Sequence, residues 1–435
     1  MHIEILKVKQ SINQKENNMV YSILDTDLYK FTTSYAYMNK FPNAECTFTF
    51  KDRNKIKRSK KFLEKFKRHL KKYCENTRLT IKELNWLLNG HRIDFIAPYY
   101  WEWLYSFRFE YDKIKVYLDE EDVLCMEVTD KCYKCSLYEI PCMFAIPEVN
   151  NADKPINWDL TMSKLKEKVD MANTHNMLFS EFGTRRRFSQ EVQDKVCMYL
   201  KEHAKTCVGT SNVYFAMKYD MKAIGTHPHE WFMFHGAQYG YKNANYMALE
   251  NWVDIYDGDL GIALSDTYTT DVFFRNFSLK LAKLFDGVRQ DSGDEYEFTD
   301  KVINFYKSKG IDYTSKTIVF SNALDFPKAV EIKEYCRKRC IKCSFGIGTN
   351  LTCDVYAPDG TKYDSENIVM KMSRCRMNVN QPWYLCIKIS DDLGKHMGDN
   401  KEFNHACYEL HIPISINHGD PKGEPGEDGS KFINK

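Results

Sequence analysis

The chain has 435 residues, of which 43% are hydrophobic and 28% charged, so it can bury a full core, most simply as two domains, and wholesale disorder is excluded. The formal net charge of +2 gives no whole-molecule reason to expect nucleic acid or a membrane as a partner. The N-terminus lacks the apolar core of a signal peptide, and no run of 18 apolar residues occurs. Fifteen cysteines, an odd number scattered from Cys46 to Cys407, therefore indicate reduced thiols and a cytoplasmic protein.

The first third of the chain mixes strand-like and helix-like segments. Residues 1–18 are polar and are expected to form an N-terminal extension. Residues 19–148 are expected to form an α+β domain, because their strands and helices do not alternate strictly. The predicted strands are "CTFTFKDR" (46–53), "KIKVYLDEEDVLCMEV" (113–128) and "KCSLYEIPCMFAI" (134–146).

Residues 51–72 hold twelve lysines and arginines against two acidic residues, which raises the possibility of a nucleic-acid surface. Apolar residues recur there at roughly helical intervals, at Ile56, Leu63, Phe66 and Leu70. This spacing predicts an amphipathic helix whose basic residues face solvent. We therefore favour a solvated helix face over a nucleic-acid site.

Two Cys-x-x-Cys pairs, Cys132/Cys135 and Cys340/Cys343, could suggest a zinc site. About 200 residues separate the pairs, whereas zinc pairs usually lie about 15 to 20 residues apart. Both pairs also lie in segments predicted as strands, where residues three apart point to opposite faces. The sequence therefore disfavours zinc.

The middle of the chain, residues 149–360, has a different pattern. Short apolar runs end in small or polar residues and are followed by helix-like segments, about 25 to 40 residues apart, which is typical of β/α units. The runs are "KAIGTHPH" (222–229), "GIALSDTY" (261–268), "LFDGVRQDSGD" (284–294), "TIVFSNALD" (317–325) and "CSFGIGTN" (343–350). Five such units predict an α/β domain, either a parallel barrel or a doubly wound sheet.

The C-terminal part is expected to return to the first domain. Residues 361–415 contain two further strand-like runs, "NIVMKMSRCRMNV" (367–379) and "PWYLCIKISD" (382–391). Residues 416–435 are too rich in glycine, proline and charge to pack, and are expected to be a flexible tail.

Candidate functional residues cluster at the ends of the predicted parallel strands, where the active site of a β/α fold lies. They are Thr226, His229, Asp266, Arg289, Asp291, Ser321, Asn322, Gly346, Gly348 and Thr349. The Gly-x-Gly-Thr of the last unit could let backbone N–H groups close on a phosphate, although a tight turn explains it as well.

Seven ordered segments resemble the nicotinate phosphoribosyltransferase family, and the resemblance runs from residue 20 to about residue 400. The segments are "TDLYKFTTSYAY" (26–37), "FSEFGTRRRFS" (179–189), "VGTSNVYFA" (208–216), "IGTHPHEWF" (224–232), "GIALSDTYTTDVFF" (261–274), "DGVRQDSGD" (286–294) and "FGIGTNL" (345–351). The resemblance implies an irregular, TIM-like parallel α/β barrel with an α+β domain formed by the N-terminal and C-terminal segments, working as a homodimer.

The implied reaction joins nicotinate to 5-phosphoribosyl 1-diphosphate (PRPP), giving nicotinate mononucleotide and diphosphate. It is the first step of NAD synthesis from nicotinate. ATP is the implied co-substrate, hydrolysed through a phosphohistidine, and Mg²⁺ is expected to accompany PRPP and ATP.

The resemblance also implies residue roles. Tyr29 and Phe182 correspond to the aromatic pair that stacks on the pyridine ring, with the tyrosine supplied by the other subunit. Arg185 and Arg289 match the arginines that meet the diphosphate and the substrate carboxylate. Asp291, Ser321 and Asn322 fall where ribose and diphosphate contacts are expected, and Gly346, Gly348 and Thr349 would hold the 5-phosphate. For Arg186 and Arg187, a structural ion pair is an equal alternative.

Ser211 bears on the choice of base. Relatives that use nicotinamide have an aspartate at this point, which accepts a hydrogen bond from the amide. An aspartate facing the carboxylate of nicotinate would bring two like charges together, whereas a serine hydroxyl can donate. Thr226 would add a second donor. Nicotinate is therefore the expected base, with nicotinamide phosphoribosyltransferase as the alternative.

Three histidines fall within "AIGTHPHEWFMFHGA" (223–237). A His-Glu-x-x-His zinc helix is excluded because the histidines of "HEWFMFH" are six apart, and no metal ligand is assigned. Pro228 marks the first turn of a helix, which places His229 at its N-terminus, and the resemblance makes His229 the phosphoacceptor. His227 is the alternative acceptor and is expected at the helix cap. Asp266 is expected to orient the His229 ring, and His235 is expected to pack or to lie at the surface.

Overall fold

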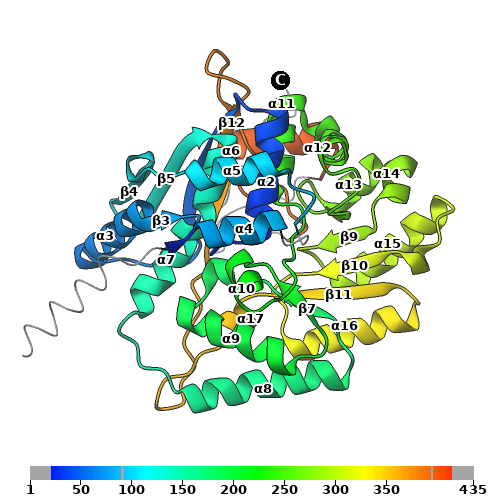
Figure 1. The fold of residues 1–435 in the computed structure, drawn as a ribbon. Coiled ribbons are helices and arrows are strands. Elements are labelled where there is room, and N and C mark those ends of the chain that lie inside the picture. Colours follow the sequence, from blue (N-terminus) through cyan, green and yellow to red (C-terminus); the bar gives the residue numbers. More distant parts are fainter. Residues whose placement is uncertain (1–20, 90–92, 393–394, 414–435) are drawn as a thin grey trace, which may run out of the picture.

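The structure is a computed structural model and describes residues 21–89, 93–392 and 395–413. The predicted N-terminal extension (1–18) and flexible tail (416–435) lie outside these ranges. The described chain is a mixed α/β protein with a five-stranded antiparallel sheet, a six-stranded parallel sheet and a small parallel pair, β1-β3 (Figure 1). One core is shared by the two larger sheets. Within the described ranges, no helix is both long enough and apolar enough to cross a membrane.

The antiparallel sheet contains strands from both ends of the sequence. Its order is β13-β12-β2-β5-β4, and its bounds are β2 Glu45–Asp52, β4 Ile114–Leu118, β5 Leu124–Lys131, β12 Ile368–Arg376 and β13 Tyr384–Leu385. Strand β12 runs beside β2, with Met370 opposite Phe50. Both strands bury alternate apolar side chains, so the period of two that marks them in the sequence also joins them in one sheet.

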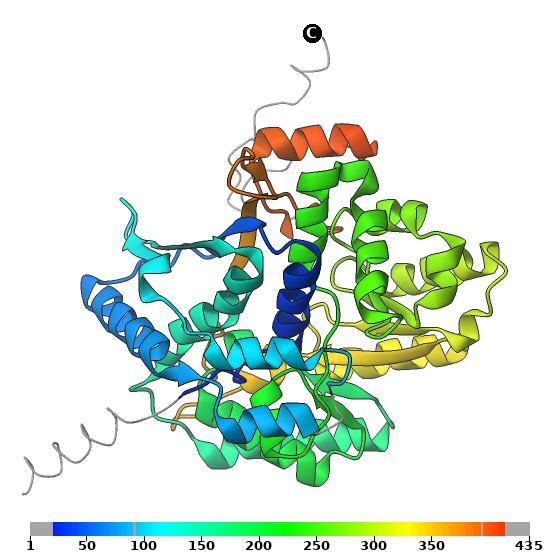
Figure 2. The ribbon, with the colours of Figure 1, turned by 45° about the horizontal axis from the view of Figure 1, so that its top comes forward.

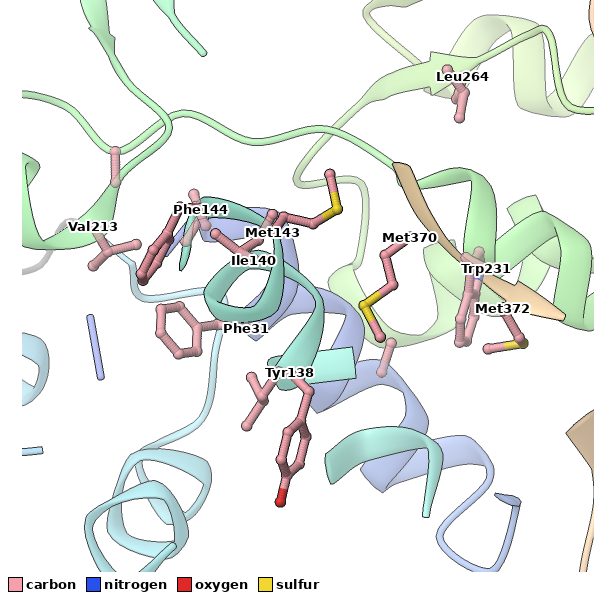
Figure 3. Close-up of a cluster of buried hydrophobic side chains, with 14 of the residues drawn as sticks. Phe31, Tyr138, Ile140, Met143, Phe144, Val213, Trp231, Leu264, Met370 and Met372 are labelled. Atoms are coloured by element: carbon pink, nitrogen blue, oxygen red, sulfur yellow. The ribbon is translucent and has the colours of Figure 1, made fainter. Parts of the chain in front are cut away.

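The strand predicted over residues 134–146 is wrong, because this segment is helical. It forms α6 Cys132–Cys135, the short 3-10 turn η2 Ser136–Tyr138 and α7 Glu139–Asn151. Helix α7 is buried on nearly every side from Glu139 to Pro147, so it has no polar face to reveal a helical period. Figure 3 shows its side chains among those of several other elements. Cys132 and Cys135 therefore lie one helical turn apart, and the opposite-faces argument against zinc fails for this pair.

Zinc gains no support from this correction. All described cysteines are free. Among the described residues, the single cluster of possible metal ligands contains no cysteine.

Six parallel strands form the second sheet, in the order β7-β6-β11-β10-β9-β8. Their bounds are β6 Phe179–Glu181, β7 Cys207–Thr210, β8 Ile262–Leu264, β9 Gly287–Gln290, β10 Thr317–Phe320 and β11 Lys342–Ile347. Helices α8 Trp158–Thr174 and α16 Phe326–Lys338 cover its outer face (Figure 1). The predicted α/β pattern is thus present.

A closed barrel is not confirmed, because β7 and β8 are not paired in the described chain. The predicted strand at 222–229 makes only one bridge, from Ala223 to Thr210. Gly225 then passes so close to helix α2 (Leu28–Lys40) that an added Cβ would lie 3.3 Å from Leu28 Cβ. The segment therefore pairs with β7 only around Ala223 and packs against α2 at Gly225.

The basic segment forms helix α3 Lys60–Asn76, capped by Ser59, which accepts a hydrogen bond from the Phe62 N–H at 3.1 Å. Phe66 and Leu70 are buried, as the spacing predicts. Ile56 lies before the helix and is exposed, so the helix begins later than the basic run.

Helix α2 runs between the two sheets (Figure 2). Beside it lies α11 His229–Tyr239, which packs on α12 Tyr241–Tyr256 and on β12. The remaining elements are β1 Tyr21–Ser22, β3 Thr77–Arg78, α4 Ile81–Asn89, α5 Pro98–Ser106, η1 Tyr111–Lys113, η3 Thr184–Arg186, α9 Gln190–His203, α10 Val213–Lys218, α13 Thr270–Asn276, α14 Leu279–Leu284, α15 Glu295–Ser308, η4 Tyr313–Ser315, α17 Thr349–Thr352 and α18 Asn400–Leu410.

Candidate active site

A cavity of about 790 Å³ opens at the carboxyl ends of the parallel strands, between them and strand β12. Thirteen of the fourteen predicted site residues line it: Tyr29, Phe182, Arg185, Ser211, Thr226, His229, Arg289, Asp291, Ser321, Asn322, Gly346, Gly348 and Thr349. The fourteenth, Asp266, is fully buried and lies behind His229. Residues up to 320 positions apart in sequence are thus brought to one cavity, as expected for the carboxyl edge of a parallel sheet.

Two aromatic rings lie at one end of the cavity. Tyr29 comes from α2, and Phe182 follows β6. A Cβ at Gly346 would lie only 2.4 Å from Phe182 Cδ2, so this glycine makes room for the ring. Both rings line the cavity of a single chain. The resemblance implies a tyrosine supplied by the other subunit, and the subunit origin of Tyr29 stays a prediction.

Ser211 is already engaged. Its hydroxyl donates to Asp27 Oδ1 at 2.7 Å, so its single proton does not point freely into the cavity. Asp27 also lines the cavity, and burial raises the pKa of its carboxyl despite the hydrogen bonds from Ser211 and Thr184. Sequence reasoning missed Asp27. Its only signal was its place in "TDLYK", two residues before Tyr29.

Arg289 is held by three groups at the ends of neighbouring strands. It donates through Nε to Ser321 at 2.8 Å, through Nη1 to Thr226 at 2.7 Å, and through Nη2 to Asp291 at 2.8 Å. Thr226 accepts in this contact, so its own hydroxyl proton stays available. Burial acts to raise the pKa of Asp291, but the charge of Arg289 holds it below its usual range. The guanidinium is therefore fixed before any ligand arrives.

His229 is the first residue of α11, and Pro228 occupies the N-cap, one residue earlier than expected. Its Nε2 lies 2.9 Å from Asp266 Oδ1. Asp266 also accepts from Ser292 at 2.7 Å and from Lys388 at 3.2 Å. Although burial acts to raise it, Lys388 and His229 hold the pKa of Asp266 well below its usual range. An ionised carboxylate only accepts, so Nε2 of His229 carries the proton.

Burial and the nearby Lys388 charge lower the pKa of His229 to about 4, so the ring is neutral at pH 7. With the proton on Nε2, Nδ1 keeps its lone pair and is the nucleophilic nitrogen. Asp291 Oδ2 lies 3.8 Å from Nε2. His229, Asp266 and Asp291 form the described cluster that could hold a metal ion, for which the sequence had assigned no ligand.

The other two histidines of the 223–237 segment are buried. The His227 ring packs 4.4 Å from Trp252, and burial lowers the pKa of His227 to about 3. His235 Nδ1 donates to the Trp231 carbonyl at 2.7 Å, and its Nε2 accepts from Asn251 at 2.9 Å. His235 therefore packs in the interior.

The two ambiguous arginines have different environments. Arg187 is buried and donates to both oxygens of Asp25, at 2.6 and 2.8 Å, and to Glu148 at 2.8 Å, which makes it part of a structural ion network. Arg186 lines the cavity, and burial together with the neighbouring Arg185 lowers its pKa to about 10.

Four lysines from the C-terminal segment also line the cavity, and sequence reasoning missed all four: Lys362, Lys371, Lys388 and Lys395. Lys395 Nζ donates to Asn322 Oδ1 at 2.5 Å and to the Asp291 carbonyl at 3.2 Å. Burial lowers the pKa of Lys371 to about 8, although Glu139 opposes the shift. A lysine in the middle of an apolar strand, as in "IVMKM" and "CIKIS", is the signal that could have found two of them.

Comparisons with family models and with known proteins all match this chain to one family. Residues 24–147 match the nicotinate phosphoribosyltransferase (NAPRTase) N-terminal domain, and residues 177–413 match the NAPRTase family. A nicotinate phosphoribosyltransferase of Methanosarcina mazei is 39% identical over 409 residues, covering 90% of this chain and 98% of the relative. One of Chromohalobacter salexigens is 38% identical over 390 residues, covering 88% and 96%.

Solved structures agree with these relatives. The crystal structure of the Porphyromonas gingivalis nicotinate phosphoribosyltransferase matches with a TM-score of 0.87 and 42% identity, covering 91% of this chain and all of that one. A putative nicotinate phosphoribosyltransferase of Saccharomyces cerevisiae matches with a TM-score of 0.83 and 30% identity, covering 91% and 99%.

Proposed function

This chain belongs to the nicotinate phosphoribosyltransferase family, which serves NAD synthesis from nicotinate. We propose that its cavity couples the transfer of phosphoribose from PRPP to nicotinate with ATP hydrolysis, through phosphorylation of His229. The observation that carries the proposal is the hydrogen bond from His229 Nε2 to Asp266, because it leaves Nδ1 as a neutral nucleophile beside a cavity rich in cationic groups.

The base binds between Tyr29 and Phe182, whose rings offer the flat faces that a pyridine needs. Thr226 donates its free proton to the nicotinate carboxylate, and the fixed charge of Arg289 lies beside it. Ser211 has a less direct role than the sequence suggests: it donates to Asp27 and so reduces the negative charge presented to the substrate.

PRPP occupies the remainder of the cavity. Arg185 and Arg289 bind the diphosphate, Asp291, Ser321 and Asn322 position the ribose, and Gly346, Gly348 and Thr349 hold the 5-phosphate. Mg²⁺ suits this site because Asp266 and Asp291 offer carboxylate oxygens within 4.8 Å of one another. When bound with PRPP, it would neutralise charge on the departing diphosphate.

The transfer itself needs no protein nucleophile. The pyridine nitrogen attacks C1 of the ribose as diphosphate leaves, and positive charge develops on the sugar ring. The arginines stabilise the negative charge of the leaving group. Enclosure between Tyr29 and Phe182 directs the nitrogen toward C1.

Phosphorylation of His229 is a separate step. Nδ1 attacks the γ-phosphorus of ATP, the bond to ADP breaks, and the imidazole Nε2 proton stays in its hydrogen bond with Asp266. The acceptor lies at the N-terminus of α11, where free N–H groups favour a phosphoryl group. The phosphate adds charge beside Lys388 and can order that side of the cavity.

The histidine assignment is tested with His229→Ala, using His235→Gln on the same helix as the control. We expect His229→Ala to lose ATP stimulation and incorporation of γ-phosphate while retaining part of the ATP-independent rate. His235→Gln should keep all three. Undiminished ATP stimulation in His229→Ala would contradict the assignment.

Nicotinamide remains the alternative base, and Asp27 is the observation that favours it. An ionised Asp27 could accept a hydrogen bond from the amide N–H, whereas it would repel a carboxylate. The two bases are distinguished by Asp27→Asn. If nicotinate is the substrate, this change lowers the nicotinate KM or leaves it unchanged; if nicotinamide is the substrate, it raises the nicotinamide KM at least tenfold.

The finer architecture is also proposed. We infer an incomplete TIM-like barrel in which residues 222–227 lie between β7 and β8. Backbone hydrogen bonds from Thr210 to Lys222 at 3.1 Å and from Ile224 to Thr210 at 2.9 Å support the β7 side. A cytoplasmic homodimer is proposed from the family resemblance and the free thiols.

A further inference from the structure

Lys30 is fully buried between two carboxylates. It follows Tyr29 on α2, and its ammonium forms ion pairs with Glu139, the first residue of α7, and with Glu230, the second residue of α11. Ser136 completes the cluster by donating to Glu230 Oε1 at 2.6 Å. Four segments of the chain therefore meet at one cation.

The cluster contacts both the proposed base pocket and the first turn of α11, which carries His229. Glu139 lies 3.5 Å from the Tyr29 hydroxyl and 3.8 Å from Arg185 Nη1, beside the proposed base pocket. Glu230 is the neighbour of His229, and its carbonyl accepts from Tyr37 of α2 at 3.3 Å. The residues that follow Lys30 and Glu230, Phe31 and Trp231, are packed in the hydrophobic cluster of Figure 3. Both helices are thus anchored on either side of the ion pair.

A buried ion pair contributes little net stability, because desolvation of the charges offsets their attraction. In some proteins a buried ionic group instead confers conformational specificity. A lysine between two carboxylates can do so by fixing where each carboxylate lies. Here the fixed groups are the first turns of α7 and α11, and the first turn of α11 carries His229.

We propose that Lys30 is a positioning residue that sets the first turn of α11, and with it His229, relative to Tyr29 and Arg185. It touches neither substrate nor the reacting atoms and acts through Glu230 and Glu139. The role of Lys30 in placing His229 rests on the proposed phosphohistidine. Its role beside Tyr29 rests only on the transfer of phosphoribose to the base.

Variants of matched net charge can separate the positioning role of Lys30 from its effect on the stability of the fold. Lys30→Met leaves Glu230 buried without its cation and is expected to lower Tm strongly. Lys30→Met combined with Glu230→Gln removes one charge of each sign, while Glu139 keeps Arg185 and Lys371 as nearby cations. This double variant is expected to recover most of the lost Tm. Lys316→Met, at a buried lysine that donates to the Phe285 carbonyl, is the control for losing any buried lysine.

For each variant, Tm, kcat and KM for nicotinate without ATP, and γ-phosphate incorporation with ATP are measured. We expect the double variant to have a kcat/KM for nicotinate at least tenfold below the parent, with phosphate incorporation reduced in parallel, at near-parent Tm. A double variant with parent-like Tm, kcat/KM and incorporation would overturn the proposal. Lys316→Met should keep the parent kcat/KM.

Ser136→Ala keeps the test decisive should the double variant fail to fold. It removes the 2.6 Å contact to Glu230 and the 3.4 Å contact from Lys30, and it leaves both ion pairs of Lys30 in place. We expect a two- to tenfold fall in kcat/KM at nearly unchanged Tm, and an unchanged kcat/KM would count against Lys30. If the parent itself incorporates no γ-phosphate, the phosphohistidine proposal fails, and the ATP-independent kcat/KM values still test Lys30.

Discussion

Asp266 and Lys388 surround the imidazole of His229 with charges of opposite sign, and the chemistry of that ring depends on both. Asp266 Oδ1 accepts a hydrogen bond from His229 Nε2 at 2.9 Å, and Asp266 Oδ2 accepts one from Lys388 Nζ at 3.2 Å. Lys388 keeps the pKa of Asp266 low against the effect of burial, and burial together with the Lys388 charge lowers the pKa of His229, so the carboxylate is ionised and the imidazole is neutral. The position at a helix N-terminus favours phosphate, but the tautomer is set by these two side chains.

Three buried histidines should make folding sensitive to mild acid. Burial lowers the pKa of His227 and of His235 to about 3, and that of His229 to about 4, against about 6.5 in an unfolded chain. Below pH 6.5 these histidines bind protons in the unfolded state but stay neutral in the folded state. Each histidine therefore contributes stability above pH 6.5, and this contribution is lost as the pH falls.

This effect is measured with His235→Gln, at a residue outside the cavity. Between pH 7.5 and 5.5, one such histidine should cost about 1.4 kcal/mol of unfolding free energy. Burial raises the pKa of Asp27, Glu181 and Glu230, and these groups titrate in the opposite sense, so the parent alone is uninformative. Urea unfolding of both proteins at both pH values should show a drop about 1.4 kcal/mol smaller in the variant. Equal drops would contradict the neutral, buried His235.

Sequence reasoning reached residues such as His229 and Asp266 because both follow predicted parallel strands, whose ends converge. It missed Asp27, Lys371 and Lys388 because their contacts are made between segments far apart in the chain. Spacing within one segment carries no information about which distant strand lies opposite. The roles of all these residues remain predictions.

At the scale of elements, helix α7 shows where a pattern fails. The run from Ile140 to Ile146 is apolar throughout, and a helix buried on all sides has the same pattern as a buried strand. Strand β12 was predicted because polar and apolar residues alternate along its second half, as expected when the two faces of a strand are buried to different extents.

The contact between strand β11 and the loop after β6 yields a specific prediction. A methyl group at Gly346 would lie 2.4 Å from the Phe182 ring, so Gly346→Ala must displace that ring. We expect the nicotinate KM to rise roughly tenfold, because an edge or stacking contact of an aromatic ring contributes about 1 kcal/mol or more. Steady-state kinetics with nicotinate varied at saturating PRPP measure the effect.

Gly348→Ala is the matched control, two residues further along the chain and just after the end of β11. Its added methyl group would lie 3.2 Å from the Phe182 carbonyl and would leave the ring in place. We expect it to raise the PRPP KM more than the nicotinate KM. The same rise in nicotinate KM for both variants would count against the ring displacement.

At the scale of the whole molecule, the C-terminal segment packs beside the N-terminal one. Strand β12 joins β2 in one sheet, and the hydrophobic core extends from α2 through α7 to the parallel strands. The five β/α units could be read from their spacing, whereas closure of a barrel could not, because it depends on how α2 packs against Gly225. The ends of the cavity are therefore set by segments that lie hundreds of residues apart.

One consequence concerns the subunits. Tyr29 and Phe182 line one cavity of a single chain, so Tyr29→Ala and Phe182→Ala should not complement each other when co-expressed. If the two rings came from different subunits, each mixed dimer would regain one intact site. Roughly a quarter of the parent activity would then return with random pairing. We expect the co-expressed pair to be no more active than the average of the separate variants, measured as nicotinate mononucleotide formed per milligram of protein.

The most direct test of the account is product formation by the purified protein with PRPP and Mg²⁺, offering nicotinate or nicotinamide, each with and without ATP. We expect nicotinate mononucleotide to be the preferred product and to form faster when ATP is present. Preference for nicotinamide would mean that Asp27, and not the donors Thr226 and Arg289, governs the base pocket. Conversion of neither base would contradict the assignment of this cavity to phosphoribosyl transfer.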